Sequence, residues 1–142
     1  MSRQAPPPRP ERLVALFVTV LWAAVVFAVD GLLAVLLDQD PIPEGIGPYY
    51  SIVAFAIAGL ILWMLLSGTS TSRHPVWGAV GALALVYLAF LLTALPWGLP
   101  LLAGQALSPF VLAAALLAAA AVVATWAAIR SLRWRRGRPS RR

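Results

Sequence analysis

The sequence predicts an all-α protein, a four-helix transmembrane bundle whose two termini both lie in the cytoplasm. Three observations predict this fold. Apolar residues make up 61% of the 142 residues and charged residues 11%, whereas soluble domains contain about 45–50% and about 25%. Four long apolar stretches follow one another along the chain. All eleven arginines lie outside these stretches, in segments that this topology places on the inner side.

Each apolar stretch has the length of a membrane-spanning helix. A hydrocarbon core about 30 Å thick requires about 20 helical residues, and the stretches contain 25, 20, 21 and 21 residues. The predicted spans are residues 13–37, 48–67, 75–95 and 109–129. They form one membrane domain, residues 13–129, preceded by a leader and followed by a tail.

Local signals mark the ends of these helices. Pro48, Pro75 and Pro109 stand where the first helical residue is expected, a position that does not need the missing N–H. Aromatic residues lie near the ends of the spans, since amphipathic rings prefer the headgroup level. Trp22 is the exception, because it lies in mid-span.

Small residues four positions apart predict close packing of helices in a membrane. The pairs are Ala24/Ala28, Ala54/Ala58 and Gly78/Ala82. We interpret them as contacts within the bundle, with an interface between copies of the chain as the alternative. The fourth span is smooth on nearly every face because of its alanines.

The distribution of arginine predicts the orientation. With the N-terminus inside, the inner segments are residues 1–12, 68–74 and 130–142, and they contain all eleven arginines. The outer loops, residues 38–47 and 96–108, contain none. Because basic residues of short loops stay on the cytoplasmic side, both termini are expected inside the plasma membrane.

The N-terminal region allows two interpretations. Residues 1–12 are rich in proline and predict a disordered leader. Alternatively, Arg12 and the apolar run up to Ala28 resemble a signal peptide cleaved after Ala28, which would leave three spans. The apolar run continues to Leu37, beyond the about 7–15 residues of the apolar h-region of a typical signal peptide, so we favour the uncleaved form.

Residues 130–142 form a basic cytoplasmic tail. We expect its arginines to contact anionic lipid headgroups, at about 1 kcal/mol for each basic residue near the surface. The candidate contacts are Arg130, Arg133, Arg135, Arg136 and Arg138. A protein or RNA partner is the alternative, but the position beside an apolar span is typical of a membrane protein, and we expect no nucleic acid.

The available residue types exclude most enzyme chemistry. The chain has no cysteine and one histidine, His74. Thiolate metal sites, a Ser-His-Asp arrangement and a two-histidine zinc motif therefore cannot form. We expect a protein that is not an enzyme and that holds no metal or cofactor. The uncharged residues 96–108 are expected to form an interfacial loop, with a re-entrant segment as the alternative.

Asp30 is the candidate for proton or ion coupling. If the first span ends near Leu32 or Leu33, Asp30 lies in its last turn, beside the outer water, and we favour this interpretation. If the helix continues to Leu37, Asp30 lies about 10 Å from its outer end and faces the bundle. An ionised aspartate at a helix centre costs about 2.5–3.5 kcal/mol, so a buried Asp30 would take up a proton and become a candidate proton carrier.

The arginine-proline leader, the four alanine-rich spans and the arginine tail resemble small four-span membrane proteins of unknown function from actinobacteria. The resemblance covers the whole chain, has no specific motif and implies no activity. The chain is also similar to small multidrug exporters, which have about four spans and a carboxylate in the first. Here that carboxylate would be Asp30, an aspartate late in its span, and its neighbours Val29 and Gly31 do not match the exporter pattern.

These features favour a non-enzymatic subunit or accessory factor of a larger membrane assembly, with the lipid bilayer as its surroundings. Its partner would be another membrane protein or a second copy of the chain. The alternative is an oligomeric, proton-coupled transporter of a small solute that uses Asp30. The two functions differ in whether Asp30 faces a water-accessible cavity.

Overall fold

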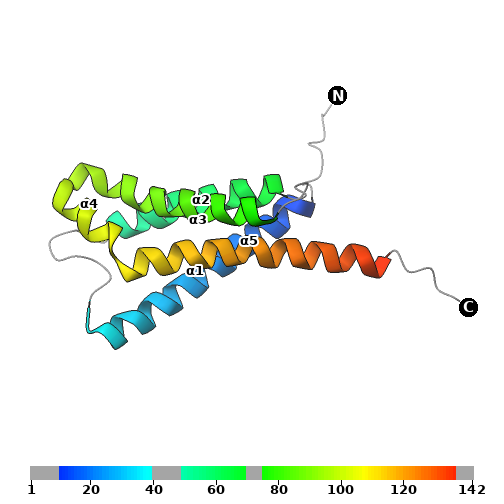
Figure 1. The fold of residues 1–142 in the computed structure, drawn as a ribbon, viewed down its shortest axis with the longest axis horizontal. Coiled ribbons are helices and arrows are strands. Elements are labelled where there is room, and N and C mark those ends of the chain that lie inside the picture. The colour runs from blue at the N-terminus through cyan, green and yellow to red at the C-terminus, as the bar shows by residue number, and fades with distance from the viewer. Residues whose placement is uncertain (1–9, 40–48, 70–74, 137–142) are drawn as a thin grey trace, which may run out of the picture.

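The computed structural model describes residues 10–39, 49–69 and 75–136, with side chains within residues 12–39, 49–68 and 75–131. Every regular element in these ranges is helical, which confirms the all-α class. The elements are α1 (Pro10–Leu37), α2 (Tyr49–Thr69), α3 (Pro75–Ala94), the 3-10 turn η1 (Leu95–Trp97), α4 (Leu99–Ala106) and α5 (Pro109–Arg136) (Figure 1).

Four of the helices are long and apolar enough to cross a membrane, as predicted. These candidate spans are Arg12–Leu37, Tyr49–Gly68, Pro75–Trp97 and Pro109–Ser131. At most 33% of the most apolar window of any span is buried inside the protein. The bundle therefore presents large aliphatic and aromatic side chains outward on all its helices, as a lipid environment requires.

The largest differences from the predicted helix ends are at the start of α1 and at the end of α5. Pro10 begins α1, so residues 10–12 form a first helical turn and are not part of a disordered leader; proline is tolerated there. At the other end, α5 continues to Arg136, so the first seven residues of the predicted tail are helical. Residues 1–9 and 137–142 lie outside the described residues.

The predicted proline starts hold for two helices. Pro75 and Pro109 are the first residues of α3 and α5. The helix α2 begins at Tyr49, and Pro48 lies outside the described residues.

The core lies where α5 meets the other long helices. Helix α3 packs against α5 and α2, and α1 packs against α2 and α5. Val26, Leu62 and Val86 are the largest fully buried side chains, one each from α1, α2 and α3. Buried alanines give α5 its narrow profile, which lets the neighbouring backbones approach closely. They are Ala114, Ala115 and Ala118.

The small-residue pairs divide between two roles. Ala54 and Ala58 are fully buried, as contacts within the bundle require. Ala24 and Ala28 are exposed on α1, so their interpretation as contacts within the bundle is wrong. The reason is the rotation of α1, which turns Trp22 and Val26 inward and leaves the alanine pair on the outer face.

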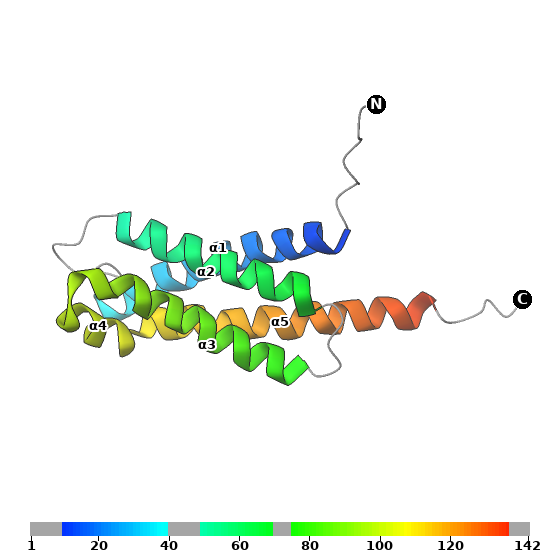
Figure 2. The same cartoon turned by 90° about the horizontal axis from the view of Figure 1, so that it is seen from above.

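Helix α1 runs obliquely to the other three long helices (Figures 1 and 2). Near its start it is close to α2: the Trp63 indole N–H donates to the Arg12 carbonyl at 3.5 Å. In mid-bundle, a Cβ added to Gly59 would lie 3.7 Å from the Thr19 methyl group. Toward Leu37 the two helices separate, which leaves space between α1 and the start of α2.

Residues 96–108, predicted as a loop, form the end of η1 and the short helix α4. The Tyr87 hydroxyl donates to the Ala106 carbonyl at 2.9 Å and so ties α4 to α3. In Figure 1 this segment folds back over the end of the bundle where α5 begins. The tertiary contact, which a loop prediction from composition cannot include, stabilises this short helix.

Candidate functional site

Asp30 lies inside the bundle. The helix α1 continues to Leu37 without a break, as in the predicted span 13–37, and it does not end near Leu32 or Leu33 as the interfacial interpretation of Asp30 required. Asp30 is 9% exposed, which matches the buried alternative for its side chain. The helix ends with a left-handed residue, Asp38 (φ 51°), and the Gln39 N–H donates back to the Ala34 carbonyl at 3.2 Å. This hydrogen bond is typical of a Schellman motif, which fixes the true end of the helix.

A cavity of about 240 Å³ lies beside Asp30. Its walls come from every helix of the bundle, because α1 has separated from α2 at this level. Tyr50 is the second residue of α2 and Phe110 the second residue of α5, so the cavity lies near the end of the bundle. The lining residues are Phe27, Asp30, Gly31, Tyr50, Ser51, Ala54, Phe55, Phe90, Gln105, Phe110 and Val111.

The polarity of this cavity is concentrated in a few atoms. The Asp30 Oδ1 atom is buried and has no hydrogen-bond partner. Gln105, brought over from α4, is 5% exposed and lines the same cavity. Buried polar atoms are almost always paired, because an unpaired one costs about 1–3 kcal/mol. Asp30 lines the cavity and its Oδ1 atom is buried without a partner, so this carboxyl group is the candidate for receiving a proton or a hydrogen-bond donor.

Aromatic rings form the apolar part of the wall. Phe27 and Phe55 are stacked with centroids 4.6 Å apart, and Phe55 meets Phe90 edge-on at 5.4 Å. Trp22 lies farther from the end of the bundle, and its ring centroid is 6.2 Å from that of Phe55. Its indole N–H donates to the Ala114 carbonyl at 3.2 Å, which explains why a tryptophan is tolerated in mid-span.

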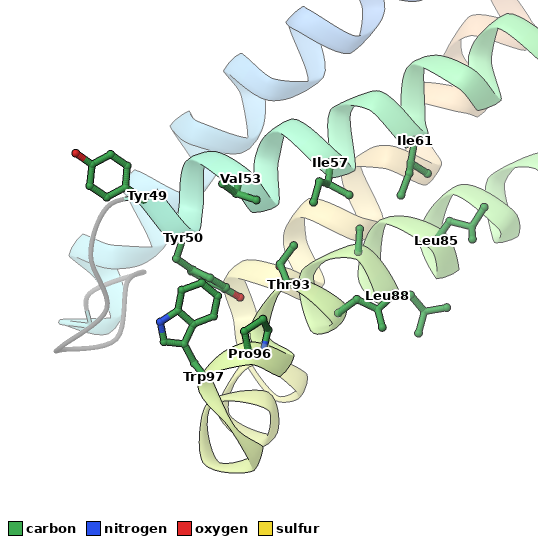
Figure 3. Close-up of a pocket in the computed structure, with 12 residues that line it drawn as sticks. Tyr49, Tyr50, Val53, Ile57, Ile61, Leu85, Leu88, Thr93, Pro96 and Trp97 are labelled. Atoms are coloured by element: carbon green, nitrogen blue, oxygen red, sulfur yellow. The ribbon is translucent and has the colours of Figure 1, made fainter.

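Tyr50 separates the Asp30 cavity from a second space. A groove of about 630 Å³ runs between α2 and α3, and Tyr50 lines both spaces (Figure 3). The Tyr50 hydroxyl donates to the Phe90 carbonyl at 3.3 Å, and its ring meets Trp97 edge-on at 5.4 Å. Most of the other side chains that line the groove are aliphatic, among them Val53, Ile57 and Leu88.

The predicted lipid-contact arginines that belong to α5 lie far from this cavity, beyond the apolar part of the helix. Arg130 is exposed and its guanidinium lies 5.0 Å from the centroid of the Trp126 ring. Arg133, Arg135 and Arg136 are in the last helical turns, and their side chains are not described. Arg138 lies outside the described residues. In the part of α5 that the structure describes, the helical positions of Arg130, Arg133, Arg135 and Arg136 are therefore separated from Asp30.

Sequence reasoning missed Gln105 and Tyr50 as site residues. Gln105 is the only amide side chain of the predicted loop 96–108, and that isolation was the available signal. Nothing in the sequence marked Tyr50 as a site residue, because aromatic residues near helix starts are common at the level of the lipid headgroups. Within residues 10–39, 49–69 and 75–136, no three histidine or acidic side chains lie close enough together to hold a metal ion.

The four apolar helices define a multi-pass membrane protein, and Asp30 is its most unusual interior group. The chain belongs to DUF6121, a family of unknown function whose pattern matches residues 1–142. This confirms the resemblance to an uncharacterised family over the whole chain, while the actinobacterial type stays a prediction. No curated protein and no solved structure gives a significant match.

Proposed function

We propose that the protein is an oligomeric, proton-coupled transporter of a small solute, in which Asp30 exchanges a proton for the solute. One observation carries the proposal: Asp30 is buried in a bundle of apolar helices and lines a cavity, and its Oδ1 atom has no hydrogen-bond partner. Intramembrane carboxylates are rare and mark proton or substrate pathways in membrane proteins.

Because Asp30 is buried, a proton and a cationic solute compete for its carboxylate. An ionised aspartate buried among apolar side chains is destabilised by the loss of its hydration, and either a proton or a cationic group on the solute removes that cost. Asp30 would therefore hold one of them at a time. Such competition at a single carboxylate couples the movement of a solute to the movement of a proton in the opposite direction.

The packing supports a state in which the Asp30 cavity is closed toward the opposite end of the bundle. Between the Asp30 cavity and the opposite end of the bundle lie the fully buried Val26, Leu62 and Val86. Release toward that end would require one part of the bundle to move relative to the rest. The oblique α1 is the natural moving part, because its C-terminal end diverges from α2 (Figure 1).

The distribution of arginine supports a location in the plasma membrane with both termini in the cytoplasm. Helix α1 then runs outward and Asp30 lies toward the outer side. In this orientation the cavity would receive solute or protons from outside the cell.

The second candidate function is that of a subunit or accessory factor in a membrane assembly. A specific observation favours it: Ala24 and Ala28 are exposed on α1, where small side chains permit close approach of another helix. That helix would come from a partner protein or from a second copy of the chain. Neither candidate function includes a covalent reaction.

The transporter proposal is tested in liposomes that contain the purified protein and an entrapped pH indicator. An imposed pH gradient should collapse faster when a transported solute is added from a panel of small amines and neutral solutes. Asp30→Asn should abolish this effect, while Asp38→Asn should keep it, because Asp38 is exposed and asparagine also tolerates its left-handed backbone. Equal solute-dependent collapse with Asp30→Asn and the unchanged protein would refute the proposal.

A further inference from the structure

We infer that the Asp30 cavity binds a small primary ammonium ion that carries one aromatic or short alkyl group. This inference rests on the proposed function and names its substrate class. The ammonium group would donate hydrogen bonds to Asp30 and Gln105, and its apolar body would lie among the phenylalanine rings.

The charge and hydrogen-bonding capacity of the wall select the head group. Asp30 and Tyr50 are the ionisable side chains among the described lining residues, and no basic side chain is among them. An ionised Asp30 therefore calls for a cation. Because the Oδ1 atom lacks a hydrogen-bond donor, the cation must also bring N–H groups. A quaternary ammonium ion supplies the charge but no donor, and an alcohol supplies a donor but no charge.

Gln105 adds a second acceptor in the same cavity. Its side-chain carbonyl oxygen can accept a hydrogen bond from an ammonium group, which has three N–H donors when primary. Gln105 comes from α4 and Asp30 from α1, so an ammonium group held by both would connect elements that are far apart in the sequence.

The remaining wall selects the body of the ligand. Four phenylalanines, Phe27, Phe55, Phe90 and Phe110, line the cavity together with Tyr50. Their faces attract cations as well as apolar groups. The volume of about 240 Å³ is below the about 300–1,000 Å³ of sites for drug-sized ligands. The ligand is therefore no larger than about one ring with a short chain.

The test measures binding to the full-length protein in nanodiscs by titration calorimetry, with 2-phenylethylamine as the probe. Two matched analogues are compared: 2-phenylethanol, which lacks the charge, and the N,N,N-trimethyl derivative, which keeps the charge but lacks the N–H donors. The amine should bind about tenfold to a hundredfold more tightly than either analogue, the contribution of one charge-assisted hydrogen bond.

Variants and pH assign that binding to Asp30. Asp30→Asn should weaken amine binding about tenfold or more, while Asp38→Asn should leave it unchanged. Lowering the pH should weaken binding by at most about tenfold per pH unit, because the proton competes with the ammonium ion for one carboxylate. If Asp30→Asn does not fold, Gln105→Leu provides the second variant and should weaken amine binding while sparing 2-phenylethanol.

Equal affinity for the three probes would overturn the inference, as would unchanged amine binding in Asp30→Asn or, in its place, Gln105→Leu. The outcomes also separate it from the proposed function. Amine binding at Asp30 without any solute-dependent proton movement would support the ligand class and refute transport. Asp30-dependent transport of another solute, without amine binding, would support transport and refute the ligand class.

Discussion

Two buried polar side chains of α1 show how a single residue can serve structure or function. Trp22 is 3% exposed and its N–H is paired with the Ala114 carbonyl at 3.2 Å. Asp30 is 9% exposed and its Oδ1 atom is unpaired. A satisfied buried polar group stabilises one arrangement of helices, whereas an unsatisfied one raises the energy of the empty state. We therefore expect Trp22 to contribute to stability, and we propose ligand or proton binding for Asp30.

Trp22→Phe should lower the free energy of unfolding by about 1–2 kcal/mol, because it removes the hydrogen bond to α5 and part of a buried ring. Unfolding in mixed micelles, followed by circular dichroism, measures the change. Trp77→Phe is the matched control: Trp77 is 74% exposed, and its substitution should change stability by less than about 0.5 kcal/mol. Equal effects of the two substitutions would contradict the structural role of Trp22.

At the scale of elements, the turn before α4 decides where Gln105 lies. Gly98 has φ 98° and ψ 171°, a backbone conformation that is open almost only to glycine. It reverses the chain after η1 and allows α4 to fold back, where Tyr87 holds it through the Ala106 carbonyl. A regular continuation of α3 would carry Gln105 away from the bundle.

Gly98→Ala should therefore destabilise the α4 region by about 1–3 kcal/mol, the cost of forcing a side chain into this conformation. Hydrogen exchange of the α4 amides would show faster opening. Gly104→Ala serves as the control, because a Cβ there has open space and alanine is the better helix former by up to about 1 kcal/mol. Slower exchange in Gly98→Ala than in the unchanged protein would show that the turn is not strained by a side chain.

The end of α5 supports a prediction about the basic tail. In an isolated peptide of residues 130–142, replacement of Arg133, Arg135, Arg136 and Arg138 with glutamine should weaken binding to anionic vesicles by about 1 kcal/mol per arginine. High salt should weaken the binding of the natural peptide by screening. A peptide with the same residues in scrambled order should bind equally, since charge alone is invoked. Binding that survives both the substitutions and the salt would refute the electrostatic account.

At the scale of the whole molecule, the even number of spans brings the two described ends of the chain together. Pro10 and Arg136 lie at the same end of the bundle (Figures 1 and 2). The predicted inner segments carry all eleven arginines, so this end is expected on the cytoplasmic side. The Asp30 cavity lies toward the opposite end, near the starts of α2 and α5.

Reporter fusions test this topology. Reporters at the N-terminus and the C-terminus should both indicate the cytoplasm, and one inserted in residues 38–47 should indicate the outside. The physical reason is the cost of moving arginine across the membrane. An N-terminal reporter found outside, or a product cleaved after Ala28, would refute the four-span topology.

The spans could be predicted from sequence because hydropathy and length are local properties. Each apolar stretch must satisfy its own backbone hydrogen bonds in lipid, and a helix does so without neighbours. Pro75 and Pro109 mark helix starts for an equally local reason, because the first helical turn does not need their missing N–H groups. The helical conformation of the last turns of α5 was not predicted. The arginine-rich composition there indicated a cytoplasmic tail, but arginine is also a good helix former.

By itself, the sequence determined the helical class, the four apolar spans and the presence of a carboxylate in the first one. Only the tertiary structure decided what surrounds that carboxylate. The burial of Asp30 depends on the oblique path of α1, and the position of Gln105 in the same cavity wall depends on the reversal at Gly98. The physical reason is that burial and pairing are properties of several helices together: a residue's hydrophobic surroundings follow from its own stretch, but its partners come from stretches that the fold brings beside it.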